Sequence, residues 1–218
     1  MLRRITTLSG AVAMFLICDF LPLDAREVSS YFSTSWTSFR DELPSDYILS
    51  MDFDKYGRLW IGTENGMASF DGTVISKYMR GTGAVSGNEL NAVLADKFYD
   101  RVWFATKRDG LGFYDLRTGN SVFFRHDKAN PNSPLSDAIT CLRQDDAGNV
   151  WFGTYTEGVG KYNVETGTFT AFCPKNVVGM AEGNVCCIEL APDGKIYAGY
   201  FAEGFMVINP VSMTAEQY

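Results

Sequence analysis

One five-residue segment, Leu59–Thr63 (LWIGT), constrains the fold more than any other feature, because the chain repeats it three times. The copies are 102–106 (VWFAT), Val150–Thr154 (VWFGT) and a more divergent one, Ile196–Tyr200 (IYAGY). The aromatic residue at the second position of each copy follows the previous one after 43, 48 and 46 residues. A period of this length is typical of proteins built from repeated structural units.

Each copy lies within a unit that predicts four short strands. In the first unit, a strand at 48–53 leads into a turn that begins at Asp54 and contains Gly57, and the motif is the second strand. Aspartate opens tight turns, and glycine accepts the positive φ that reverses the chain. A polar loop, a third strand that ends at Phe70 and an outer strand through Tyr78 complete the unit. Equivalent loop glycines recur in all units, at Gly66, Gly110, Gly158 and Gly204.

Four antiparallel strands per unit predict an all-β fold, a β-propeller with four blades at about 43–80, 86–127, 134–173 and 181–218. A sandwich or barrel also contains regular short strands, but neither requires one motif to recur four times. We expect the aromatic residues Trp60, Trp103, Trp151 and Tyr197 to fill the wedges between blades. The small residue two positions later in each copy fits a strand with a crowded backbone.

Residues 1–25 predict a signal peptide or an N-terminal anchor. Arg3 and Arg4 precede an apolar run at 11–18, which is shorter than the roughly 20 residues of a membrane-spanning helix. A cleaved leader and an uncleaved inner-membrane anchor both remain open, and either predicts an exported, periplasmic protein. Residues 26–42 contain a lone strand, at about 31–39, that belongs to no complete unit.

Charge and cysteine content exclude some classes of function. A net charge of -7 and the absence of clustered Lys and Arg argue against a nucleic-acid partner. Four cysteines follow the leader, and Cys141 and Cys187 occupy equivalent places on neighbouring units. Packed sheets lie about 10 Å apart, farther than a disulfide spans. We therefore expect buried free thiols.

Three segments of the third unit resemble the two-component regulator propeller repeat. They are 135–142 (LSDAITCL), 145–154 (DDAGNVWFGT) and 158–162 (GVGKY). The resemblance extends over about 43–218 and implies the periplasmic sensor region of hybrid two-component systems of Bacteroidetes. Such sensors carry about fourteen blades in two propellers, a membrane helix, a kinase and a DNA-binding regulator.

The resemblance thus suggests that this chain is the amino-terminal portion of such a sensor, truncated and lacking the kinase. The four blades would belong to a larger ring of about seven, and the lone strand would complete a later blade. Self-closure of four blades remains the alternative. Without closure, the first and fourth blades expose apolar faces, so we expect self-association.

No catalytic or metal site is predicted. The one histidine, His126, lies in a polar segment between units, where a solvated loop histidine is the simplest interpretation. The carboxylate pairs at 52–54 and 145–146 begin turns, which explains them without chemistry. No cofactor is expected either.

The loops between the second and third strands are the candidate ligand site. They are equivalent in the repeat, so they should gather on one face around the axis, and their sequences vary on a fixed frame. The residues concerned are Glu64, Asn65, Lys107, Arg108, Asp109, Tyr155, Glu157, Tyr200 and Glu203. Tyr155, Tyr200 and Arg108 could stack on, or hydrogen-bond to, an oligosaccharide.

Three functions follow as hypotheses. The first is a periplasmic recognition module for glycan fragments, in which the sugar class comes from the family resemblance alone. The second is a non-signalling gene fragment. The third is a propeller lyase or lactonase, which needs converging histidines or carboxylates that this sequence does not offer.

Overall fold

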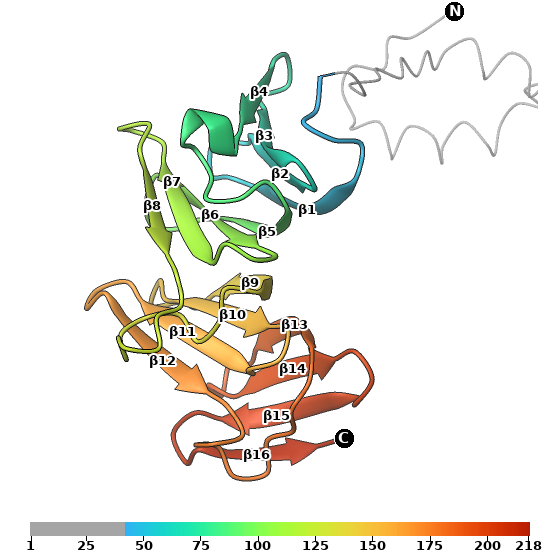
Figure 1. Cartoon of the computed structure of the whole chain (residues 1–218), viewed down its shortest axis with the longest axis vertical. Helices are drawn as coiled ribbons and strands as arrows, with labels where there is room; N and C mark the ends of the chain where they lie inside the picture. Colours follow the sequence, from blue (N-terminus) through green and yellow to red (C-terminus); the bar gives the residue numbers. More distant parts are fainter. Residues whose placement is uncertain (1–41) are drawn as a thin grey trace, which may run out of the picture. The chain divides into compact units, whose positions relative to one another are not determined.

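Sixteen β-strands and one short 3-10 helix, and no α-helix, make up residues 42–218, which the computed structural model describes (Figure 1). These residues belong to a unit that begins at Phe39. The expected leader at 1–25 and the expected lone strand at 31–39 lie outside the described residues. The prediction of an all-β chain is confirmed for the part that the structure describes.

The strands form four sheets, each with four consecutive antiparallel strands in sequence order. Blade 1 contains β1 (Ile48–Phe53), β2 (Leu59–Thr63), β3 (Gly66–Phe70) and β4 (Ile75–Tyr78), and blade 2 contains β5 (Leu90–Ala95), β6 (Arg101–Thr106), β7 (Leu111–Asp115) and β8 (Ser121–Phe124). Blade 3 contains β9 (Ile139–Gln144), β10 (Val150–Thr154), β11 (Val159–Asn163) and β12 (Thr168–Phe172), and blade 4 contains β13 (Val185–Leu190), β14 (Ile196–Tyr200), β15 (Phe205–Asn209) and β16 (Thr214–Gln217). The 3-10 helix, Arg80–Thr82, lies between blades 1 and 2.

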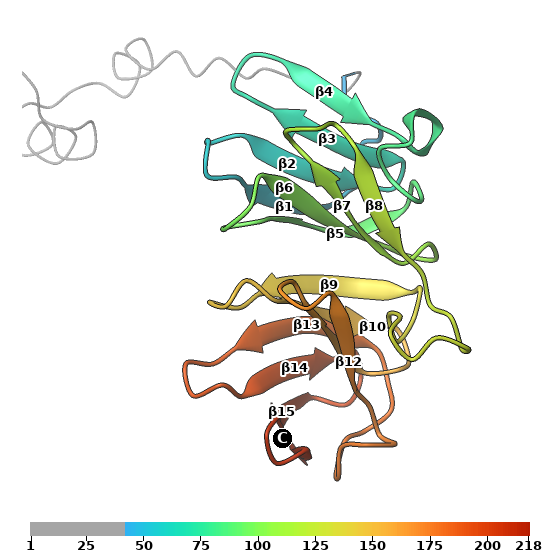
Figure 2. The same ribbon diagram turned by 90° about the vertical axis from the view of Figure 1, so that its left-hand side faces the viewer.

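The four blades are arranged as an arc about a common axis. Figure 1 shows the first strands β1, β5, β9 and β13 along the concave side and the fourth strands β4, β8, β12 and β16 along the convex side. Each first strand packs beside the first strand of the next blade. Blades 1 and 4 lie at opposite ends of the arc in both views (Figures 1 and 2). The blades are therefore those of a β-propeller, and the four do not close on themselves.

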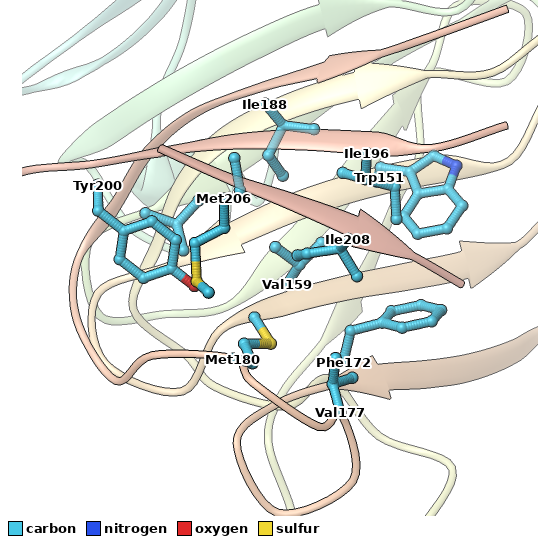
Figure 3. Packing of buried hydrophobic residues seen from close by; sticks show 12 residues of the cluster. Trp151, Val159, Phe172, Val177, Met180, Ile188, Ile196, Tyr200, Met206 and Ile208 are labelled. Carbon is cyan, nitrogen blue, oxygen red and sulfur yellow. The ribbon is translucent and has the colours of Figure 1, made fainter. Parts of the chain in front are cut away.

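The wedges between blades form the hydrophobic core. Trp60 lies in the wedge between blades 1 and 2, Trp103 in the next wedge and Trp151 in the wedge between blades 3 and 4, and all three are buried. Figure 3 shows the last wedge, where the Trp151 and Phe172 rings stack with centroids 5.4 Å apart. The expectation that the aromatic anchors fill wedges is correct for the tryptophans. It is wrong for Tyr197, which is exposed on the outer side of blade 4.

The glycine of the motif permits close approach of neighbouring blades. A Cβ added to Gly62 would lie 3.0 Å from the Val93 Cγ1 atom of blade 2, and one added to Gly153 would lie 2.8 Å from the Val185 Cγ1 atom of blade 4. These separations are shorter than normal carbon contacts. The prediction that the small residue of the motif accommodates a crowded backbone is confirmed for Gly62 and Gly153.

A carboxylate holds the turn and the tryptophan of blades 1, 2 and 3 together. In blade 1, the Trp60 indole N–H donates to Asp54 Oδ2 at 3.0 Å, while Asp54 Oδ1 accepts the Tyr56 and Arg58 amides. Asp96 and Asp145 bind their own tryptophans in the same way, each at 2.9 Å. These aspartates therefore do more than open turns, because each one also accepts a bond from the tryptophan of its own blade. Blade 4 carries Ala191 and Tyr197 at these positions.

Candidate functional site

The loops between second and third strands are joined to the segments that link successive blades. The first residue of each loop donates its amide to the residue just before its own blade's first strand, as Lys107 does to Glu89 O at 3.0 Å and Tyr155 to Ala138 O at 3.0 Å. The glycines that end the loops of blades 1 and 2 donate to the next linking segment, Gly66 to Asn88 O at 2.7 Å and Gly110 to Asp137 O at 3.0 Å. We call this side of the arc, with loops 64–65, 107–110, 155–158 and 201–204, the loop face.

A buried threonine rigidifies three of these loops from inside. Thr106 Oγ1 donates to Gly110 O at 2.9 Å and accepts the Asp109 amide at 2.8 Å. Thr63 and Thr154 make the equivalent bonds in blades 1 and 3. The loop backbone is thereby fixed while the side chains at its tip point to solvent. This is the arrangement that binding loops on a rigid scaffold require.

Tyr200 does not belong to the candidate site. It occupies the threonine position in blade 4, is buried, and packs with Met206 and Ile208 in the wedge between blades 3 and 4 (Figure 3). Burial raises the pKa of its hydroxyl to about 12. The interpretation of Tyr200 as a stacking residue is wrong, because its ring is covered by the core.

The other candidate residues remain accessible, and several carry charge. Glu64, Asn65, Lys107, Arg108, Tyr155, Glu157 and Glu203 are exposed, and Asp109 is half-buried. Asp109 forms an ion pair with Arg125, and Lys107 Nζ lies 3.7 Å from Glu89. Asn65 Oδ1 accepts a bond from Asn88 at 3.0 Å. The sequence-based candidate set omitted Phe201, whose ring is exposed on the blade 4 loop.

A groove of about 610 Å³ adjoins the loop face beside blade 3. Its lining includes His126 and Lys128 from the linking segment, Glu157 from the loop, and Phe169 and Lys175. His126 is exposed, and its Nδ1 lies 2.7 Å from Pro134 O. A groove of this volume with mixed polar and aromatic lining can hold a small ligand. Glu157 is the one predicted site residue in its lining, and no sequence signal indicated the others.

A second groove, of about 460 Å³, follows the concave side of the arc and is lined by all four first strands. Arg143 crosses from β9 to Glu189 of β13 with bonds of 3.1 and 2.8 Å. Cys186 and Cys187 also line this groove and are exposed. The expectation of burial is therefore wrong for these two thiols, because blade 4 leaves the axial side of β13 open. All four cysteines at 42–218 are free thiols.

Between residues 42 and 218, no three His, Cys, Asp or Glu side chains lie so that they could hold a metal ion. The same residues contain no helix with the length and apolar character needed to cross a membrane.

Two segments of the chain match the model of a known protein family. The model of the two component regulator propeller family matches residues 42–65 and 133–156, which contain the first two strands of blades 1 and 3. None of the curated proteins matches the sequence.

Three solved structures are similar to the chain. The extracellular domain of BT3049, described as a hybrid two component system of B. thetaiotaomicron, is 28% identical over 79% of this chain and 24% of its own, with a TM-score of 0.74. The extracellular domain of BT4673, described as a one component system of the same organism, is 21% identical over 81% of this chain and 25% of its own, with a TM-score of 0.63. Virginiamycin B lyase from Staphylococcus aureus is 13% identical over 79% of this chain and 55% of its own, with a TM-score of 0.57.

The likeness to the lyase and to BT4673 concerns the fold alone, because their sequence identities to this chain are 13% and 21%. The chain spans about a quarter of the length of the two Bacteroides domains. Strand order, the repeated motif and the family match agree with one another. Residues 42–65 and 133–156 therefore match the two component regulator propeller repeat, and the described chain folds into blades of a β-propeller.

Proposed function

We propose that this chain is part of the ligand-recognition region of an exported sensor of the hybrid two-component type, and that its ligand is a glycan fragment. The likeness to an extracellular domain of such a system, at 28% identity, supports export and sensing. In this proposal, the four blades are part of a larger sensor, and any kinase is supplied outside these residues.

The observation that carries the proposal is the combination of fixed loop backbones with exposed side chains. Tyr155 of blade 3 and Phe201 of blade 4 expose aromatic rings on the loop face. Arg108, in the loop of blade 2, exposes a guanidinium on the same face. Aromatic rings stack on the apolar faces of sugars. Charged side chains donate hydrogen bonds to sugar hydroxyls or accept them from these hydroxyls. Because the loop amides are already bonded to the linking segments, ligand binding would order few backbone groups. Low ordering cost favours affinity.

The neighbouring groove supports an extended ligand. Glu157 belongs to the same loop as Tyr155 and also lines the groove of about 610 Å³. A chain of sugars lying across the loop of blade 3 could therefore contact Tyr155 with one residue and Phe169 with another. This geometry favours an oligosaccharide over a monosaccharide.

Isothermal titration calorimetry of the chain with neutral and acidic oligosaccharides tests the proposal. We expect binding heat for at least one class, and Tyr155→Ala should weaken binding about fivefold, as the loss of a stacking ring costs about 1 kcal/mol. Glu157→Gln should weaken the longer oligosaccharides more than the shorter ones. Tyr56→Ala is the matched control, because this equally exposed tyrosine belongs to a turn between first and second strands.

Two results would contradict different parts of the proposal. If no oligosaccharide releases heat, the glycan class is wrong. If heat is released but Tyr155→Ala and Glu157→Gln leave the affinity unchanged, the loop face is not the site.

A further inference from the structure

The outer edge of β12 carries backbone groups that no neighbouring strand pairs with. β12 is the fourth strand of blade 3 and pairs only with β11. At the start of this edge, the Asn132 side chain takes the place of a partner strand. Its Nδ2 atom donates to Gly167 O at 3.3 Å, and its Oδ1 atom accepts the Phe169 amide at 2.8 Å. One side-chain amide thus bonds a carbonyl and the N–H group two residues further along.

A second asparagine makes the same pair of bonds at the end of this edge. Asn176 Nδ2 donates to Ala171 O at 2.7 Å, and Asn176 Oδ1 accepts the Cys173 amide at 2.8 Å. Backbone groups of alternate residues point to the same side of a strand, so Phe169 O and the Ala171 N–H also point outward. Among residues 42–218, neither group has a hydrogen-bond partner. We call this pair, Phe169 O with the Ala171 N–H, the middle slot.

In blade 4, the backbone of the linking segment closes the equivalent edge. Val178 donates its amide to Met213 O at 3.0 Å and accepts the Ala215 amide at 2.8 Å. These bonds correspond in register to those of Asn132 in blade 3. Gly179 then lies against Ala215 O so closely that a Cβ would overlap this oxygen. The carbonyl equivalent to Phe169 O is therefore covered in blade 4, whereas blade 3 leaves its slot open.

The middle slot lies in the groove of about 610 Å³ beside blade 3, whose lining includes Phe169 and Ala171. A group that fills the slot must accept a hydrogen bond from the Ala171 amide and donate one to Phe169 O. An extended peptide would run along the edge and collide with the side chains of Asn132 and Asn176, which occupy the adjoining positions. The slot therefore suits a compact group that approaches the strand edge end-on.

The adjoining positions indicate the chemistry of this group. At both of them, an outward amide of β12 donates to an amide oxygen, Asn132 Oδ1 or Asn176 Oδ1. The acetamido group of an amino sugar carries such an oxygen, and a hydroxyl on the adjacent ring carbon supplies the donor. Its methyl group requires apolar surroundings, which Pro134 and Leu135 of the lining offer. An acetamido group beside a free hydroxyl thus matches the slot.

We propose that the middle slot binds a 2-acetamido sugar, so that the chain recognises glycan fragments that contain N-acetylhexosamine. This inference rests on the proposed function and adds the class of sugar to it. The acetamido oxygen accepts the Ala171 amide, and the neighbouring hydroxyl donates to Phe169 O. Glu157 lines the same groove, so the following sugar units extend toward the loop of Tyr155.

Chitotetraose and cellotetraose are the matched ligands for the test, because they differ only in the acetamido or hydroxyl group at C2 of each unit. Isothermal titration calorimetry of the 218-residue chain should show that chitotetraose binds at least about fivefold more tightly, the factor for one hydrogen bond. Hydrogen exchange measured by NMR gives a readout that needs no variant. Chitotetraose should slow exchange of the Ala171 amide more than cellotetraose does.

Ala171→Pro removes the donor of the slot without removing a bond of the sheet. The Ala171 amide points away from β11, and proline is tolerated on edge strands where the N–H does not join the ladder. Affinity for chitotetraose should fall about fivefold, to that for cellotetraose. Gln217→Pro is the matched control, because Gln217 has the same position in β16, and this variant should bind as the parent does. Far-UV circular dichroism of both variants should match the parent, and the exchange measurement decides if Ala171→Pro does not fold.

The outcomes separate this inference from the proposed function. If other oligosaccharides release heat and chitotetraose does not, or if the two tetramers bind equally, the acetamido assignment is overturned and the glycan proposal stands. An Ala171 amide whose exchange is unaffected by bound chitotetraose also overturns the assignment, as does an equal loss of affinity for Ala171→Pro and Gln217→Pro. Absence of heat from every oligosaccharide overturns both proposals.

Discussion

Replacing Asp96 by alanine should destabilise the protein more than any other substitution of a turn aspartate. The Asp96 carboxylate is buried and accepts bonds from the Trp103 indole at 2.9 Å, the Arg101 Nε atom at 2.6 Å and the Gln144 amide at 2.9 Å. It also accepts the amides of residues 98 and 99 at 2.9 and 3.1 Å. The side chain thus joins the turn, the second strand of blade 2 and the first strand of blade 3.

The expected loss is about 3–5 kcal/mol in the free energy of unfolding, the range for breaking a buried charge pair by removing one partner. In Asp96→Ala the Arg101 guanidinium, whose side chain is 13% exposed, would keep its charge without a carboxylate. The buried Trp103 indole would lose its acceptor as well. Gln144 retains its 3.2 Å bond to Gly148 O, so its contribution to the loss is small. Such a loss is a large share of the stability of an ordinary domain.

Urea titration followed by tryptophan fluorescence measures this change, and Asp193→Ala is the control. Asp193 lies in the corresponding turn of blade 4, where its pair with Lys195 at 3.3 Å is exposed, so little change is expected. A loss below about 1 kcal/mol for Asp96→Ala would refute the argument that this carboxylate holds the wedge together. An equal loss for both variants would refute it too.

The same carboxylate predicts an acid dependence. Burial raises the pKa of Asp96, but the bonds from Gln144, Arg101 and Trp103 outweigh it, so that the pKa lies below its usual value. The folded state therefore favours the charged form, and the contribution to stability is complete above about pH 4 and is lost as the pH falls through the lowered pKa. The stability difference between parent and Asp96→Ala should shrink over that acid range.

Two further predictions concern a glycine and the thiols. Gly110 has a φ of 82° and a Cβ there would overlap Phe124 O, whereas Gly57 has a φ of 81° with open space around it. Gly57→Ala should cost about 1–2 kcal/mol and Gly110→Ala clearly more in the same urea titration, and equal costs would show that the overlap is relieved. Iodoacetamide at pH 8 should label exposed Cys186 before Cys141, whose pKa is raised to about 11 mainly by burial, because the thiolate is the reactive form. Mass spectrometry after timed quenching measures the order, and equal labelling rates would contradict it.

Features that repeat along the chain could be predicted from sequence, and features that depend on what adjoins a blade could not. The motif LWIGT occupies β2, and its copies are second strands too, because strand and turn signals are local. Tyr197 has the motif position of a buried tryptophan, yet it is exposed because no blade of the described chain follows it. Burial of such a residue is decided by its neighbour in space.

The candidate site shows the same division. Because the loops are equivalent in the repeat, the sequence predicts that Arg108 and Tyr155 lie in the loops between second and third strands, and both side chains are accessible there. An alignment of the four motifs would have excluded Tyr200 from the candidate site, because Tyr200 occupies the position of the buried Thr154 of blade 3. The groove beside blade 3 had no sequence signal, because it depends on how the segment around His126 lies against β12.

Blade 4, with Ala191 and Tyr197 where the other blades have a carboxylate and an indole, also limits what spectroscopy can observe. The tryptophans of residues 42–218 all belong to blades 1, 2 and 3, so among them Trp151, in the wedge between blades 3 and 4, is the one whose emission reports on blade 4. Opening of β14 to β16 should change the Trp151 emission and the exchange of those amides together, at lower denaturant than the opening of blades 1 and 2, because stability in a repeat array differs from unit to unit. Amides of β6 and β10 should exchange last, since each of these strands has a packed wedge on both sides.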